Sequence, residues 1–448
     1  MDLKRISIIC SLVLIMFMTA IETSIVSLAL PTMRDDLHAT QPISLVFTVY
    51  FVGIVLSIPI LSELMSRIKI IYVTMAGLIL FLVGSLLSGM STQFEMLVFA
   101  RLLQGVGAGA NMSLAQIVTK LAFEIPFRYK VIGVVGSVWG ISSILGPFLG
   151  GFILEVSTWH WLFYINIPIA VLVMGLVLMS YHFENESTSK HKVDFVGMGL
   201  FYVLLALLMA SVLITGHIWM NIVSFILFVL LIVIMFKRMK KVSPSFIPVD
   251  EFVPTVRLAF LTDFFIAVVL IGFNVFIPSY LQDHLGLSPL QSGLIIFPLS
   301  IGWLLINFTL EKIEAHRTVR GLYLLAIGIL IVGSISIIIN AFHPIIVAVT
   351  LAFIGASFGT AYTKDSVMVQ EGTSPESMKK MMSLFTLTRN MGSSIGSAIM
   401  GYIYAMDGFL FKASIQDVMI FCLMILVALM IVWFTRKDKS LRTISKKN

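Results

Sequence analysis

The sequence predicts an all-α polytopic membrane protein with fourteen transmembrane helices, arranged as two six-helix bundles plus two inserted helices. Hydrophobic residues make up 58% of the chain and charged residues only 12%. Soluble globular proteins average about 45–50% apolar and about 25% charged residues. A helix crosses a bilayer core about 30 Å thick with about 20 apolar residues. In order, the expected spans are 7–30, 43–62, 70–90, 94–119, 131–155, 161–181, 195–215, 218–236, 258–280, 291–310, 321–341, 344–363, 381–405 and 415–434.

The first four spans are bounded by short polar segments. The first span follows Lys4 and Arg5, and it is longer than the apolar region of a typical signal peptide. We therefore expect it to be retained as a helix. Only the three residues 91–93 separate the third span from the fourth, so this boundary is the narrowest in the chain.

Loop lengths predict the domain organisation. The two longest polar stretches, 182–194 and 237–257, bracket the seventh and eighth spans. Removing that pair leaves six spans on each side. We therefore expect an N-terminal bundle (1–181), a linker with two inserted helices (182–257), and a C-terminal bundle with a basic tail (258–448).

Basic residues predict the orientation, because Lys and Arg mark cytoplasmic loops. Both termini are basic, and alternate loops carry Arg67 and Lys69; Lys120, Arg128 and Lys130; Lys190 and Lys192; Lys237, Arg238, Lys240 and Lys241; Lys312 and Arg317; Lys379 and Lys380. The intervening loops hold only Arg34 and Lys412. We expect a multi-pass plasma-membrane protein with both termini in the cytoplasm. The net charge of +7 is spread along membrane borders, which argues against nucleic acid as a partner.

The sequence contains no motif for a cofactor, a metal or an enzymatic reaction. Its two cysteines, Cys10 and Cys422, lie in apolar runs and give neither a disulfide framework nor metal-ligand spacing. The eight histidines are scattered, and no phosphate-binding GxxxxGK[ST] loop occurs. We expect no cofactor, no metal and no enzyme activity.

Glu22 is a lone carboxylate within the uncharged segment 6–30. Ionisable groups at bilayer depth are costly and usually functional. Glu22 lies about nine residues, or ~13 Å, from the outer end of its span, and Arg101 about seven residues, or ~10 Å, from that of the fourth. The two can meet at one level. We expect Glu22 to bind and release protons with Arg101 as its charge partner; the alternative is a static buried ion pair.

Asp263, in the ninth span, is a second candidate proton-coupling acid, and Arg389 in the thirteenth lies at a similar inner depth. Asp263 is close enough to the boundary that partial hydration is an equal alternative. The remaining acids are expected at the surface. These are Glu311, Asp365 and Glu371 at inner helix ends, and Glu155 and Asp283 at the outer rim.

Small residues of the fifth span recur at steps of three and four, which places them on one helix face and lets another helix approach closely. Gly140, Gly146, Pro147, Gly150 and Gly151 are the candidate gating residues. The alternative is static close packing. The thirteenth span repeats a similar pattern of small residues, and such an echo is typical of a duplicated transporter.

Aromatic and polar residues suggest an adaptable apolar binding pocket, since aromatic faces attract flat cations. The candidates are Tyr50, Gln104, Phe273, Phe276 and Phe297. For each aromatic residue, the alternative is packing or contact with lipid.

Several motifs together resemble those of the major facilitator superfamily, in its fourteen-helix drug:proton antiporter branch. The matching residues are Glu22, Thr23 and Ser27–Pro31; Arg101, Gln104, Gly105 and Gly107; Gly146, Pro147, Gly150 and Gly151; Trp161, Phe163, Asn166 and Pro168; and Tyr280–Gln282, Gly286, Ser288, Pro289, Gln291, Gly293 and Pro298. The resemblance covers nearly the whole chain and implies the major facilitator fold.

Two departures from that branch are visible. Its first helix usually carries Asp where this chain has Glu22, which keeps the charge but lengthens the side chain, so we expect a different coupling geometry. The loop after the second helix usually has a Gly, Asp, Arg, Gly pattern, and here Ser62, Ser66, Arg67 and Lys69 stand in those places. Only the arginine is kept, which puts the usual inner-gate charge relay in doubt.

The resemblance implies a proton-coupled antiporter that exports apolar, often cationic, drugs. Its partners would be small-molecule drugs, protons and the lipid bilayer, and we expect a monomer. One alternative is the same machine with a metabolite, amino acid or lipid as cargo. Another is a membrane enzyme or sensor, which the short loops and missing catalytic motifs disfavour.

Overall fold

The computed structural model describes residues 3–65, 68–123, 127–183, 194–213, 218–239, 241, 249–314, 317–374, 377–406 and 413–436. All regular elements in these ranges are helices. They are α1 (Leu3–Asp36), α2 (Leu45–Met65), α3 (Ile70–Gly89), α4 (Phe94–Ala122), α5 (Phe127–Val156), α6 (Trp161–Tyr164), α7 (Asn166–Ser180), α8 (Phe195–Leu213), α9 (Ile218–Met239), η1 (Val249–Glu251), α10 (Pro254–Ile271), η2 (Gly272–Phe276), α11 (Ile277–Asp283), α12 (Pro289–Glu314), α13 (Val319–Asn340), α14 (Pro344–Gly372), α15 (Met378–Ala405) and α16 (Ser414–Thr435).

The fourteen expected spans are confirmed, because each falls on one helix or on one interrupted helix. The sixth span is α6 followed by α7, and the ninth is α10, η2 and α11. The element η2 is a π-helix. Pro278, just after it, cannot donate a backbone hydrogen bond, and its ring would clash with a carbonyl one turn earlier in a regular helix. A widened π turn accommodates such a break.

Apolar composition separates the spans into classes. In the described chain, nine spans are long and apolar enough to cross a membrane unaided, and α2, α5 and α8 contain shorter apolar segments. The two remaining spans, α4 and α15, are more polar, and they carry Arg101 and Arg389. These two arginines therefore lie on spans that neighbouring helices must shield from lipid.

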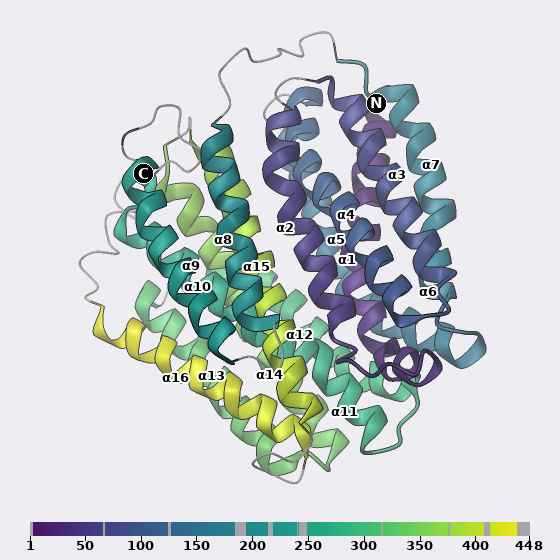
Figure 1. Cartoon of the computed structure of the whole chain (residues 1–448), viewed down its shortest axis with the longest axis vertical. Coiled ribbons are helices and arrows are strands. Elements are labelled where there is room, and N and C mark those ends of the chain that lie inside the picture. The colour runs from purple at the N-terminus through teal and green to yellow at the C-terminus, as the bar shows by residue number, and fades with distance from the viewer. Residues whose placement is uncertain are drawn as a thin grey trace.

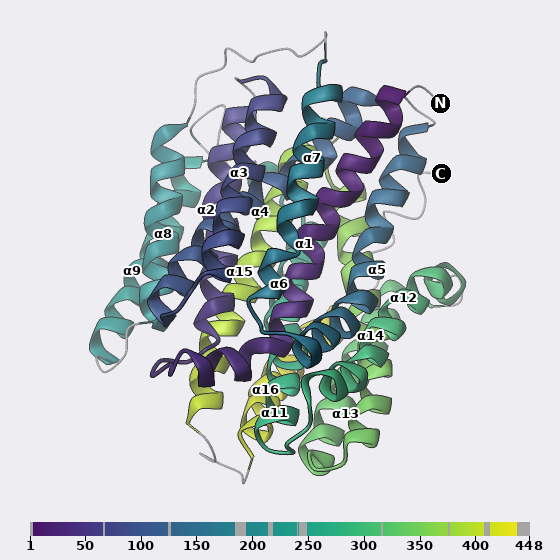
Figure 2. The same cartoon turned by 90° about the vertical axis from the view of Figure 1, so that its right-hand side faces the viewer.

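The helices form two bundles, α1–α7 and α10–α16, and the pair α8–α9 lies along one side of them (Figures 1 and 2). The bundles meet where α5 packs on α12 and where α2 packs on α15. In the inserted pair, Arg238 of α9 binds Asp194 beside α8. The Tyr202 hydroxyl of α8 donates to the Leu56 carbonyl of α2, so this pair also contacts the N-terminal bundle.

The hydrogen bonds between the bundles cluster at one end of the molecule, here called the distal end, where α1 finishes and α2 begins. Gln282 donates to the Leu28 carbonyl at 2.9 Å. Ser397 donates to the Ser44 carbonyl at 3.1 Å, and Ser394 donates to a carbonyl of α2 at 3.3 Å. The opposite end, where α1 begins, is called the proximal end. The structure is therefore closed at the distal end.

Candidate functional site

A fully buried polar cluster lies inside the N-terminal bundle. The Nη1 of Arg101 donates to Oε1 of Glu22 at 2.5 Å and to Oε1 of Gln104 at 2.7 Å. The side-chain amide of Asn166 donates to the second oxygen of Glu22 at 2.8 Å and to the Ser85 hydroxyl at 3.1 Å. Gln104 also donates to Ser85 at 2.8 Å. Glu22 and Arg101 both have 0% exposure, so the contact expected from their depths is present.

Glycines bring the helices close enough to enclose this cluster. A Cβ on Gly105 would lie 2.1 Å from the Tyr50 carbonyl, and one on Gly84 would lie 2.5 Å from the Gln104 nitrogen. These contacts let α2, α3 and α4 pack with their backbones nearly touching. The Arg101 guanidinium lies 4.2 Å from the centre of the Tyr50 ring, and a second ring, of Phe163, lies 5.6 Å away. Such cation–π contacts stabilise a desolvated cation.

Within the cluster, Glu22 and Arg101 compensate each other's charge. A buried ion pair loses several kcal/mol when one partner is neutralised, because the other becomes an uncompensated buried charge. Two polar atoms, Nη2 of Arg101 and Oδ1 of Asn166, have no hydrogen-bond partner among the described residues. Arg101 therefore has a free donor with which to make a new contact if Glu22 takes up a proton.

A second ion pair lies in the C-terminal bundle. Arg389 of α15 donates through Nε to Asp263 of α10 at 2.9 Å, and its Nη2 also contacts Asp263. The guanidinium lies 3.5 Å from the centre of the Tyr362 ring. The Asp263 side chain is 2% exposed and that of Arg389 is 19% exposed. Arg389 therefore keeps some contact with the surroundings, unlike the fully enclosed Arg101.

The prediction that Asp365 is a surface group was wrong. Asp365 is fully buried, and one of its oxygens accepts a hydrogen bond from the Tyr323 hydroxyl at 2.6 Å. The apolar run ends near residue 363, but α14 continues as a helix to Gly372, which turns Asp365 towards α13. Glu371 and Glu155 are exposed as expected. The side chain of Glu311 lies outside the described residues.

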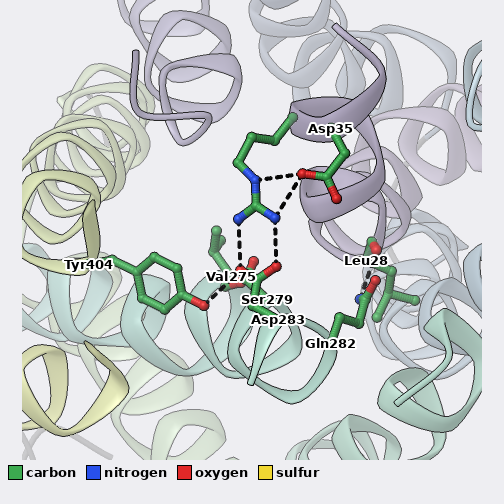
Figure 3. A network of polar contacts seen from close by, with 8 residues as sticks. Leu28, Asp35, Val275, Ser279, Gln282, Asp283 and Tyr404 are labelled. Atoms are coloured by element: carbon green, nitrogen blue, oxygen red, sulfur yellow. Dashed lines mark hydrogen bonds and ion pairs between the residues drawn. The ribbon is translucent and has the colours of Figure 1, made fainter. Parts of the chain in front are cut away.

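Asp283 is a rim group, as expected, and it also joins the two bundles (Figure 3). Arg34 of α1 donates from Nη1 and Nη2 to the two oxygens of Asp283 at 3.0 and 2.9 Å. The Tyr404 hydroxyl donates to the same carboxylate at 3.0 Å. Asp35 also accepts from Arg34 at 2.9 Å, but it lies on α1 itself. We call the Arg34–Asp283–Tyr404 set the distal latch.

The small residues of α5 face two different neighbours. A Cβ on Gly146 would lie 2.3 Å from the Ser24 hydroxyl, and one on Gly150 would lie 3.1 Å from a Cα of α1. Both therefore pack within their own bundle. A Cβ on Gly151 would lie 2.6 Å from a Cα of α12, and one on Gly293 of α12 would lie 2.5 Å from the carbonyl oxygen of Pro147. Only this second face lies between the bundles.

Gly140 is a further residue of the predicted gating face, and its surroundings lie outside the described residues. The same holds for Ser62, Ser66 and Arg67, the degraded loop motif, while Lys69 is exposed. The role of these residues stays a prediction.

The five predicted binding residues are not gathered in one place. Tyr50 and Gln104 belong to the buried cluster around Arg101. Phe273 packs edge-to-face on Phe358, Phe276 packs on Tyr404, and Phe297 is partly buried. The geometry of Phe273 and Phe276 supports the packing alternative for this conformation.

Two members of the cluster, Ser85 and Asn166, were not among the predicted site residues. Both are uncharged and lie in apolar spans, so no charge distinguishes them in the sequence. Polar groups inside spans face the bundle interior, and Asn166 stands in a motif that supported the family resemblance. The polar character of Asn166 inside a span and its place in that motif could together have identified it as a site residue.

Comparisons with known proteins agree on one family. The profile of the Major Facilitator Superfamily matches residues 12–397. The chain is 53% identical over 434 residues to "Multidrug efflux pump SdrM" of Staphylococcus aureus (strain N315), covering 97% of each chain. It is 27% identical to "Multidrug transporter protein MdtP" of Bacillus subtilis (strain 168), covering 89% of this chain and 75% of that protein.

Solved structures agree with the fold. A bacterial homologue of the human lysosomal transporter Spinster, in an inward-facing and unoccupied conformation, superposes with a TM-score of 0.65 at 13% identity, covering 100% of this chain and 98% of that one. The nucleoside transporter NupG superposes with a TM-score of 0.66 at 15% identity, covering 98% and 100%. At such identities the likeness shows the fold alone.

Proposed function

Because the chain belongs to the major facilitator superfamily, we propose that it is a proton-coupled antiporter that exports apolar, cationic drugs across the plasma membrane. Its identity to a protein named as a multidrug efflux pump supports the drug cargo. The observation that carries the coupling is the Glu22–Arg101 pair, with 0% exposure of both side chains. A titratable carboxylate in that position has few structural reasons to exist.

The basic loops support a cytoplasmic proximal end, which puts the distal latch at the outer face. In that orientation the closed end is the outer one, as an inward-facing state requires. Proton binding to Glu22 would release Arg101 to other partners, and loss of the proton would restore the ion pair. Alternating access then delivers protons inward and drugs outward, as repeats rocking about a central site allow.

The proton gradient supplies the driving force. Each net charge moved inward through the membrane potential yields about 2.3 kcal/mol per 100 mV. Exchange of one proton for one monovalent cation moves no net charge, so the pH difference drives that exchange. Cations suit this mechanism, because a carboxylate that has lost its proton attracts positive charge. The Tyr50 ring beside Arg101 offers a face on which a flat cation could replace the guanidinium.

The test is substrate-dependent proton flux in proteoliposomes with an imposed pH gradient, using a fluorescent cationic dye. The wild type should move dye against its gradient, and Glu22→Gln should not. Glu155→Gln is the matched control, since Glu155 lies in the same bundle but is exposed, and it should transport normally. Gradient-driven transport by Glu22→Gln would show that Glu22 is not the coupling group.

A further inference from the structure

Asp365 is a buried carboxyl that the coupling scheme above does not use. It lies in α14 with 0% exposure. Its Oδ1 accepts the hydrogen bond from Tyr323 at 2.6 Å, and its Oδ2 has no hydrogen-bond partner among the described residues. An ionised carboxylate with one oxygen unsatisfied is strongly disfavoured in an apolar interior.

The charged groups that act on Asp365 are Asp263 of α10 and Arg389 of α15. Arg389 is committed to Asp263, with Nε and Nη2 both donating to it, and it is stacked on Tyr362. Lys364, the preceding residue of α14, has interactions of its own. Among the described contacts, Arg389 therefore hydrogen-bonds Asp263 and acts on Asp365 only through its charge.

The hydrogen-bond donor to Asp365 is held rigidly. The Tyr323 ring stacks on Trp433 of α16, with ring centres 3.8 Å apart and planes 13° apart. The indole nitrogen of Trp433 donates to the Thr262 hydroxyl at 3.0 Å, and Thr262 precedes Asp263. The surroundings of both acids thus form one connected arrangement across four helices, α10, α13, α14 and α16.

The net charge of the group formed by Asp263, Asp365 and Arg389 depends on whether it holds a proton. With Asp263 and Asp365 both ionised, the group with Arg389 carries a net charge of −1; with one proton added it is neutral. Two close carboxylates in a shared low-dielectric site do not both ionise readily, and the proton they hold belongs to the pair. Arg389 is 19% exposed, so the group is less completely enclosed than the Glu22 cluster.

We propose that Asp365 is a second proton-binding site, which holds a proton in this conformation and gives the transporter one exchangeable proton in each bundle. This inference rests on the proposed function. On release, the proton passes to water beside Arg389 and leaves the group with its charge of −1. That charge would attract a cationic substrate, so proton and substrate compete in the C-terminal bundle as well.

The first test reads the proton directly, without transport. Infrared difference spectroscopy of the purified protein at neutral pH should show the carbonyl band of a protonated carboxylic acid, and Asp365→Asn should remove it. Tyr323→Phe should shift that band without abolishing it, because the acid stays and only its hydrogen bond is lost. Glu155→Gln should leave it unchanged. If Asp365→Asn folds and its spectrum matches the wild type, the inference is overturned.

The second test measures the number of protons exchanged per substrate from the pH gradient at which dye flux reverses in proteoliposomes held at zero membrane potential. Asp365→Asn should halve the wild-type ratio while dye transport persists. An unchanged ratio in a variant that has lost the carbonyl band would overturn the inference, since the proton would then be static. Absence of proton-coupled transport by the wild type would instead refute the proposed function, and the infrared result would still stand.

Discussion

Breaking the distal latch should shift the protein towards a state that is open at the distal end. Asp283→Asn replaces the carboxylate that holds Arg34 through two hydrogen bonds of 3.0 and 2.9 Å and also binds Tyr404. The two Arg34–Asp283 contacts join the bundles, so an alternating-access cycle must break them to open the distal end. A perturbation that weakens one state alone shifts the equilibrium by the full difference in free energy.

The size of the shift follows from the burial of the latch. Hydrogen bonds to charged groups are worth about 1.5–3 kcal/mol, while exposed ion pairs give about 0.2–1 kcal/mol. The Arg34 side chain is 36% exposed and that of Asp283 is 12% exposed, which places this pair between the two cases. A loss of about 1–2 kcal/mol changes the ratio of closed to open molecules by about 5–30-fold.

The assay is a distance distribution between two spin labels across the distal end. Thr92 and Met406 are exposed, and they lie at the distal ends of opposite bundles. Cys10 is exposed and would be replaced by serine, whereas Cys422 is buried and can remain. In the wild type, the short distance should dominate. In Asp283→Asn, a longer distance should gain population by the factor given above.

Asp35→Asn is the matched control for this measurement. Asp35 also accepts a hydrogen bond from Arg34, yet it lies on the same helix and is 71% exposed. Its loss should leave the distance distribution unchanged. If Asp35→Asn shifts the populations as much as Asp283→Asn, or if neither shifts them, the latch does not control opening.

Three further predictions concern packing, coupling and orientation. Gly151→Leu should abolish dye efflux at normal membrane abundance, because the new side chain clashes between the bundles. Gly175→Leu should be active, because nothing lies within 4 Å of a Cβ added there. Equal efflux by both variants would contradict a tight interface. Glu22→Asp should retain part of the proton-driven efflux, and complete loss would mean that a carboxylate alone is insufficient. In intact cells, an impermeant thiol reagent should label a cysteine at Met406 but not one at Lys69, and the reverse pattern would invert the proposed orientation.

The sequence predicts best those features that depend on the length of an apolar run or on the position of a charged residue within it. Fourteen spans could be predicted because each apolar run must cross the same thickness. Glu22 and Arg101 could be matched because depth along a helix is a simple count of residues. Their contact needs only that α1 and α4 lie side by side, which the fold supplies.

Features that depend on which way a helix turns could not be predicted. Hydropathy shows where an apolar run ends, but α14 extends beyond that point, and this hid the burial of Asp365. Gly150 and Gly151 are adjacent, yet they point about 100° apart around α5. Consequently one faces its own bundle and the other faces the opposite bundle. A pattern of small residues predicts that another helix packs closely on that face, but it does not identify which helix.

The π-helix η2 sets the rotational register between two functional ends of one span. Asp263 lies before it in α10, and Asp283 ends α11 after it. A π turn accommodates one more residue than an α turn, and each residue of a helix advances about 100° around the axis. Without that extra residue, α11 would be rotated by about this angle relative to α10, and the Asp283 carboxylate would point away from Arg34. The widened turn is therefore what lets a single span face Arg389 at one end and the opposite bundle at the other.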